Sequence, residues 1–125
     1  MTAQARTAAP LGLDARGIRV TGPAGPLVDP LDLTVPPGRT LAIIGESGSG
    51  KTMTARAITG LLPAGVTATG TLSIDGAAIE LDAPEAAWRR VRGPRAVLLL
   101  QDPFTSLSPT HRCGDQIGLG ILARE

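Results

Sequence analysis

Residues 40–52 read Thr-Leu-Ala-Ile-Ile-Gly-Glu-Ser-Gly-Ser-Gly-Lys-Thr, and they are the most informative part of the sequence for predicting the fold. Residues 40–44 form a continuous apolar run, which is typical of a strand buried on both faces. After the glycines, apolar residues recur at helical spacing over residues 51–62, and Gly60 and Pro63 supply stop signals. The order of strand, loop and helix predicts an α/β fold.

The glycine-rich loop has the composition of a phosphate site. Residues 45–52 fit the pattern G-x-x-x-x-G-K-[ST], in which glycines let successive backbone N–H groups point at an anion. Lys51 is the only lysine of the chain, and its compact ammonium would reach the β- and γ-phosphates of a nucleoside triphosphate. Thr52 would offer its hydroxyl to Mg²⁺, and the helix that follows adds its positive dipole end. The pattern alone leaves transporters, kinases, GTPases and helicases open. The nucleotide-binding residues it predicts are Gly45, Glu46, Ser47, Gly48, Ser49, Gly50, Lys51, Thr52 and Met53.

Composition limits the other functions. A chain of 125 residues is one domain or part of one, and a hydrophobic fraction of 42% is enough for a core. With a net charge of +1, one Trp, one Phe and no Tyr, nucleic-acid binding is not expected. The densest arginine cluster, over residues 89–95, is interpreted as a solvated face. Cys113 is the only cysteine and is interpreted as a small buried or incidental thiol. Neither a secretion signal nor a run of about 18 apolar residues is visible, so we expect a soluble chain that reaches any membrane through a partner.

The amino-terminal third has weaker patterns. Residues 1–12 are rich in Ala, Thr and Pro and are expected to form a disordered tail, with the domain over residues 13–125. Alternating apolar residues predict strands over residues 13–20 and 31–35, the second after a bend near Pro30.

Local signals predict a hairpin and a short helix further along. Residues 71–76 alternate and end in Asp-Gly, and residues 77–81 can pair back as the second strand. Asp82 is the expected N-cap of a helix to about Val91, with Glu85 three residues after the cap.

A second apolar run, residues 96–100, is expected to be another buried strand, with Gln101 at its end. In an open α/β sheet the carboxyl ends of strands collect the ligand chemistry, so Gln101 and the glycine loop would meet. The amide oxygen of Gln101 could ligate Mg²⁺ and hold an attacking water, whereas the alternative is a polar strand end without a role. A last helix is expected from His111 onward, with Thr110 as its cap.

Four segments together closely resemble the ATP-binding subunits of ABC transporters, and within them the oligopeptide, dipeptide and nickel uptake group. These segments are residues 45–52, 58–63, 92–93 and 101–109, of which the last reads Gln-Asp-Pro-Phe-Thr-Ser-Leu-Ser-Pro. The resemblance covers nearly the whole chain after the tail, and two spaced motifs make it specific.

The resemblance implies a P-loop NTPase core with an amino-terminal antiparallel β-subdomain, truncated at the start of the helical subdomain. It makes residues 45–52 the Walker A loop for ATP and Mg²⁺, with Thr52 and Gln101 at the metal. Gln101 would be the Q-loop residue that couples the nucleotide site to the membrane. The implied function is ATP binding, with hydrolysis in the complete protein, to power import of peptide or nickel. The implied partners are transmembrane permease subunits and a second nucleotide-binding subunit, at the cytoplasmic face of the membrane.

The chain departs from the family pattern in two respects. Family members stack the adenine on an aromatic residue near the first strands, but this chain has no aromatic residue before Trp88. Base affinity is therefore expected to be weak, or to depend on another contact. The signature sequence, the Walker B aspartate, the catalytic glutamate and the switch histidine would all come after Glu125, and His111 lies in the wrong segment to be the switch residue.

These departures leave an alternative function open. The chain could be a non-catalytic remnant that binds nucleotide or a partner without turnover, and no residue in it is predicted to be the general base. Poor stability of the isolated chain is expected, because its apolar strands would lack neighbours. A different P-loop enzyme, such as a small-molecule kinase, is disfavoured by residues 101–109.

Overall fold

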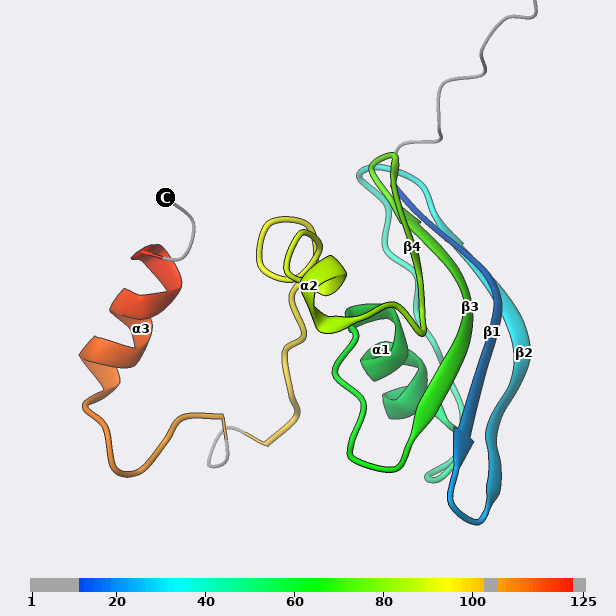
Figure 1. The fold of residues 1–125 in the computed structure, drawn as a ribbon, viewed down its shortest axis with the longest axis horizontal. Coiled ribbons are helices and arrows are strands. Elements are labelled where there is room, and N and C mark those ends of the chain that lie inside the picture. Colours follow the sequence, from blue (N-terminus) through cyan, green and yellow to red (C-terminus); the bar gives the residue numbers. More distant parts are fainter. Residues whose placement is uncertain (1–11, 103–105, 123–125) are drawn as a thin grey trace, which may run out of the picture.

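The computed structural model describes residues 12–102 and 106–122. The disordered tail predicted over residues 1–12 therefore lies, apart from Gly12, outside the described residues. The elements in chain order are β1 (Leu13–Gly22), β2 (Gly25–Val35), α1 (Lys51–Thr59), β3 (Thr67–Ile74), β4 (Ala77–Glu80), α2 (Glu85–Trp88) and α3 (Cys113–Leu122). The four strands form one antiparallel sheet in the order β2-β1-β3-β4, and α1 lies against one face of it (Figure 1). The expected antiparallel β-subdomain is thus confirmed.

The core lies between the sheet and α1. The central strand β1 buries Ala15, Ile18 and Val20 completely, and Leu72 of β3 is 1% exposed. Ala57 of α1 belongs to the same buried cluster. Its small side chain allows α1 to approach the sheet closely, which brings the start of α1 and the loop before it next to β2.

A β-bulge in β1 explains why the sequence pattern of this strand is weak. The buried positions change from odd numbers at Ala15 to even numbers at Ile18 and Val20, so one extra residue shifts the alternation. The extra residue falls between Arg16 and Ile18, where the register with β2 and β3 shifts. Gly17 has a φ of 59° there, a left-handed conformation that glycine adopts most readily.

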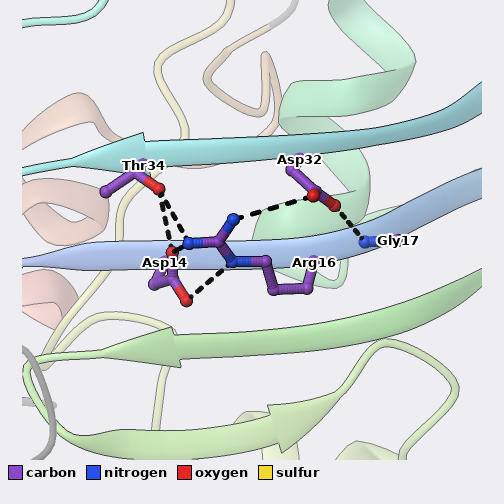
Figure 2. A network of polar contacts seen from close by, with 5 residues as sticks. All are labelled: Asp14, Arg16, Gly17, Asp32 and Thr34. Atoms are coloured by element: carbon purple, nitrogen blue, oxygen red, sulfur yellow. Dashed lines mark hydrogen bonds and ion pairs between the residues drawn. The ribbon is translucent and has the colours of Figure 1, made fainter.

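A network of hydrogen bonds and ion pairs on the outer face of the sheet surrounds this bulge (Figure 2). Arg16 donates to both carboxylate oxygens of Asp14 at 3.1 and 2.6 Å, and Thr34 Oγ1 donates to Asp14 Oδ1 at 2.9 Å. Asp32 accepts the Gly17 N–H at 2.7 Å and pairs with Arg16 Nη1 at 3.6 Å. The hydrogen bond from Arg16, then that from Thr34, lowers the pKa of Asp14 below its ordinary value. The network therefore gives the unpaired N–H at the bulge a partner and links β1 to β2.

Strand β2 is longer than predicted. It begins at Gly25 instead of residue 31, and the predicted bend is a register irregularity inside a continuous strand. Val20 pairs with Val28 and Ile18 with Leu31, so β2 has one extra residue around Pro30. Proline lacks a donor, which is why the ladder is interrupted there without ending the strand.

The predicted hairpin is confirmed. Ile74 pairs with Ala77, and Asp75 and Gly76 form the two-residue turn with φ values of 48° and 81°. Two consecutive positive φ values define a type I′ turn, for which Asp-Gly is a preferred sequence. β3 starts earlier than predicted, at Thr67.

Helix α1 ends at Thr59, so the prediction that it continues to Leu62 was wrong. Gly60 is left-handed, with φ 65° and ψ 29°, and its N–H donates to the Ala57 carbonyl at 3.2 Å. The Leu61 N–H donates to the Arg56 carbonyl at 2.9 Å. These two bonds form a Schellman motif, which terminates the helix at its glycine.

The prediction that the two apolar runs, residues 40–44 and 96–100, form buried strands was wrong. Neither is a strand in the described part of the chain, apart from a single bridge between Arg92 and Ala96. Ile44 is 93% exposed and Leu99 is 92% exposed. The physical reason is that a strand requires hydrogen bonds from a neighbouring strand, and the sheet described above offers these segments no such neighbour.

The two remaining helices also differ from their predicted bounds. The N-cap of α2 is Pro84, without a side-chain hydrogen bond, and Asp82 is not the cap. A residue that precedes proline avoids the helical region, so the helix cannot begin before Pro84. The helix is also shorter than predicted, but the turn that follows continues with hydrogen bonds from Val91 and Arg92 to the Trp88 carbonyl.

Helix α3 begins at Cys113 and not at His111, because the side chain of Gln116 reaches back to Ser108 and to the His111 carbonyl and holds the preceding turn. Thr110 instead contacts the His111 ring at 3.1 Å. α3 has no buried residue and lies apart from the sheet (Figure 1). Cys113 is exposed, so a buried thiol is excluded.

The arginine cluster has structural contacts. Arg92 pairs with Glu85, and Arg95 Nη1 donates to the Ile74 carbonyl at 3.4 Å.

None of the helices in the described ranges is long and apolar enough to cross a bilayer.

Candidate functional site

The glycine-rich loop is fixed by the end of β2 nearest to α1. Gly50 precedes the first residue of α1 and has a φ of 93°. A Cβ at this position would lie 2.9 Å from Val28 Cγ2 and 3.0 Å from the Leu27 carbonyl oxygen. Only a glycine allows the loop to pass this close to β2. The packing of β2 under the loop therefore sets the direction in which α1 starts.

The loop closes on itself through its backbone. The Ser49 N–H donates to the Glu46 carbonyl at 3.1 Å, and Gly48 between them has a φ of 80°. At the start of α1, both the N–H and the hydroxyl of Thr54 donate to the Gly50 carbonyl at 2.9 Å. No side chain caps the first turn of α1. The positive end of the helix dipole thus opens toward the loop.

Lys51 lies inside this loop. Its Nζ donates to the Gly45 carbonyl at 2.7 Å, to the Glu46 carbonyl at 2.6 Å and to Ser49 Oγ at 3.2 Å. An ammonium group has three N–H donors, so the loop satisfies all three. The loop therefore holds a positive charge at its centre.

A cavity of about 530 Å³ opens beside this charge. It is lined by Leu27, Ser47, Gly48, Gly50, Lys51, Thr52, Met53 and Gln101. The structure thus brings Gln101 to the loop, although the strand that was expected to carry it there is absent. Of the other predicted residues, Gly45, Glu46 and Ser49 hold Lys51 instead of lining the cavity.

Leu27 is the lining residue that the sequence did not indicate. It is 42% exposed and follows the turn between β1 and β2. An apolar side chain after a turn is too common to be a signal by itself. Its position becomes informative only when the packing of β2 against Gly50 is known.

The charge of the cavity favours an anion. Among the residues that the structure describes, its lining contains one cation, Lys51, and no acidic side chain. Hydroxyl, amide and backbone groups supply the remaining polar contacts. A phosphate chain matches this combination of a single ammonium and many neutral hydrogen-bond donors.

The comparison with known proteins agrees with this geometry. The family model described as ABC transporter matches residues 28–119, more than half of the chain. The chain belongs to the ABC transporter family. The match includes the glycine loop, Gln101 and the segment between them.

Relatives from several bacteria are similar to the chain. The oligopeptide transport ATP-binding protein OppD of Escherichia coli is 39% identical over 109 residues, which cover 84% of this chain and 32% of OppD. A putative peptide import ATP-binding protein of Brucella ovis is 41% identical over 97 residues, covering 73% of this chain and 29% of that protein. The peptidoglycan transport ATP-binding protein YejF of Agrobacterium fabrum is 43% identical over 93 residues, covering 73% of this chain and 17% of that protein. The chain spans about a third or less of the length of these relatives.

The lining residues also fit Mg²⁺. Thr52 and Gln101 both line the 530 Å³ cavity and also a neighbouring cavity of about 490 Å³, so the two residues border the same region. Hydroxyl and amide oxygens are hard ligands suited to a cation that keeps several of its waters. A group of three or more His, Cys, Asp or Glu side chains that could enclose a metal is absent from residues 12–102 and 106–122. Thr52 and Gln101 therefore suit a magnesium ion that arrives with a phosphate ligand.

Proposed function

We propose that this member of the ABC transporter family binds MgATP on residues 45–53 and belongs to an ATPase that powers peptide import. The single observation that carries the proposal is the common cavity of Lys51, the glycine loop and Gln101. The names of the relatives support peptide as the solute class and give no support to nickel.

Each residue of the cavity has a chemical role in this proposal. The Lys51 ammonium would pair with the terminal phosphates, and the unpaired N–H groups at the start of α1 would bind phosphate oxygens. Thr52 and Gln101 would hold the metal through oxygen atoms. Bound Mg²⁺ supplies neutralisation of phosphate charge in such sites.

The base would be held weakly. Among the described residues, the cavity lining has no aromatic side chain, and its large apolar side chains are Leu27 and Met53. Stacking on an aromatic residue is worth about 1–3 kcal/mol per base, so its absence lowers affinity by about tenfold. Since Leu27 offers only apolar contact, we expect little discrimination between ATP and GTP.

Binding without turnover is the second candidate function of these 125 residues. The observation that favours it is that none of the described residues lining the 530 Å³ cavity has a carboxylate, and that Asp102 lines the neighbouring 490 Å³ cavity instead. Hydrolysis is accelerated by a base that takes a proton from the attacking water, and Gln101, an amide, can orient the water but cannot deprotonate it. We propose that hydrolysis requires groups from outside this segment.

We propose permease subunits and a second nucleotide-binding subunit as partners, which would hold the chain at the cytoplasmic face of the membrane. The family and the word "transport" in the names of relatives support this. No nucleic-acid partner is proposed.

Isothermal titration calorimetry with MgATP tests the proposed binding. Lys51→Ala should reduce ATP binding below detection, because the phosphates would lose their only cationic partner in the cavity. Arg19→Ala, which removes an exposed cation on β1 far from the loop in sequence, is the control and should bind as the wild type does. Equal ATP affinity in the wild type and Lys51→Ala would overturn the proposal. Phosphate release by the purified chain would reject binding without turnover.

A further inference from the structure

Ser49 has contacts that its place in the glycine loop does not require. Its hydroxyl accepts from Lys51 Nζ at 3.2 Å, while its backbone N–H donates to the Glu46 carbonyl at 3.1 Å. The side chain also lies across the loop, because a Cβ built on Gly45 would be 2.5 Å from Ser49 Oγ. Ser49 therefore contacts both limbs of the loop and the ammonium between them.

The three acceptors of Lys51 are unequal. The carbonyl oxygens of Gly45 and Glu46 lie 2.7 and 2.6 Å from Nζ, whereas Ser49 Oγ lies at 3.2 Å. The longest of three hydrogen bonds from one ammonium is the weakest. An incoming anion can take the N–H that points to Ser49 while the two carbonyl bonds remain.

We propose that Ser49 is a positioning residue for Lys51, and that its hydroxyl accepts one N–H of the ammonium until a phosphate oxygen replaces it. The proposal rests on the proposed nucleotide function. A free lysine side chain loses rotational freedom about several bonds when it becomes ordered, which is an entropic cost. In this loop that cost is met before the ligand arrives, so the site is preorganised for the terminal phosphates. Once a phosphate oxygen has replaced it at Lys51, the Ser49 hydroxyl can turn and donate to the phosphate, because a hydroxyl both accepts and donates.

The matched variants are Ser49→Ala, Ser49→Thr and Ser47→Ala. Ser49→Ala removes the hydroxyl, and Ser49→Thr retains it. Ser47 lines the cavity in the same loop but is not among the acceptors of Lys51, so Ser47→Ala is the control. The ligands are ATP and inorganic tripolyphosphate, each with Mg²⁺, and adenosine.

The first readout is affinity. Ser49→Ala should weaken ATP and tripolyphosphate by about three- to tenfold, the range for one lost hydrogen bond, and should leave adenosine unchanged. Ser49→Thr should restore the affinity, and Ser47→Ala should have a smaller effect than Ser49→Ala. Unchanged phosphate affinity in Ser49→Ala would overturn the proposal.

The second readout is the NMR signal of the lysine ammonium, which belongs to one residue because Lys51 is the only lysine. In the chain without nucleotide, Ser49→Ala should shift this signal and speed its hydrogen exchange, and Ser49→Thr should reverse both changes. A purely structural role of Ser49 would change the melting temperature without this residue-specific response. An unchanged ammonium signal in Ser49→Ala overturns the positioning role. If neither ATP nor tripolyphosphate binds the wild type, the nucleotide function fails instead, while the ammonium signal still reports on Ser49.

Discussion

The contact between Gly60 and Trp88 predicts that adding one methyl group at Gly60 would lower the free energy of unfolding substantially. Gly60 is left-handed, and a Cβ there would lie 2.3 to 2.7 Å from three atoms of the Trp88 ring. Trp88 is only 3% exposed, so its ring has no solvent-filled space into which to move. In Gly60→Ala, the left-handed backbone costs about 1–2 kcal/mol, and the overpacked ring adds about 1–3 kcal/mol. We expect a total loss of about 2–5 kcal/mol in the free energy of unfolding.

Gly38→Ala is the matched control. Gly38 has a φ of 70°, close to the 65° of Gly60, but a Cβ built on it meets nothing within 4 Å. This variant should lose only the backbone term, about 1–2 kcal/mol. Urea unfolding followed by the fluorescence of Trp88, the only tryptophan, measures both variants with one probe.

A double-mutant cycle separates the clash from the strain. In a Trp88→Leu background the ring is gone, so Gly60→Ala should cost about as much as Gly38→Ala, measured by circular dichroism. Equal losses in Gly60→Ala and Gly38→Ala when Trp88 is present would refute the argument from the ring contact.

Three further predictions concern the polar network, the exposed apolar segments and the metal. The pKa of Asp14 lies below its ordinary value, chiefly because Arg16 donates a hydrogen bond to its carboxylate. The stability that the ionised Asp14 contributes is therefore fully present above the ordinary carboxyl pKa and is lost as the pH falls through the lowered pKa. An NMR titration should show this low midpoint, and Arg16→Gln should raise it; an unchanged midpoint would exclude the network as the cause. Because Ile44 and Leu99 are almost fully exposed, Ile44→Lys and Leu99→Lys should each reduce light scattering of the concentrated chain without lowering its melting temperature. A fall in melting temperature would show that these side chains are buried in solution. Thr52→Val should reduce the gain in ATP affinity on adding Mg²⁺ by about tenfold while changing metal-free binding little; an undiminished magnesium effect would remove Thr52 from the metal site.

Features encoded by a few neighbouring residues were predictable from the sequence. The Asp75-Gly76 turn was predicted because two positive φ values are required and these residues tolerate them. The glycine loop was also predictable as a loop before a helix, since Gly48 and Gly50 mark the positions with positive φ. These signals are local and do not depend on the rest of the fold.

Features that depend on distant neighbours were not predictable in the same way. Residues 40–44 and 96–100 have the composition of buried strands, but a strand forms only where another strand supplies hydrogen bonds. The bulge at Gly17 hides the alternation of β1, although a glycine inside a strand is a known signal for a bulge. The place of Leu27 in the cavity depends on how β2 packs against Gly50.

The candidate site was predictable in its residue types but not in its internal contacts. Lys51, Thr52 and Gln101 were assigned to phosphate and metal from motif and spacing, and they do line one cavity. The sequence did not show that carbonyl oxygens of the loop accept hydrogen bonds from the Lys51 ammonium, because those hydrogen bonds follow from the path of the backbone. The roles of these residues in binding stay predictions.

The proposed MgATP site can be examined by NMR, by following the backbone and side-chain amide shifts of the chain during titration with MgATP. We expect the amides of residues 47–48 and 50–53 and the side-chain amide of Gln101 to shift together and saturate at one ligand concentration, because they border one cavity. Shifts confined to other parts of the chain, or saturation of Gln101 at a different concentration from the loop, would contradict this expectation.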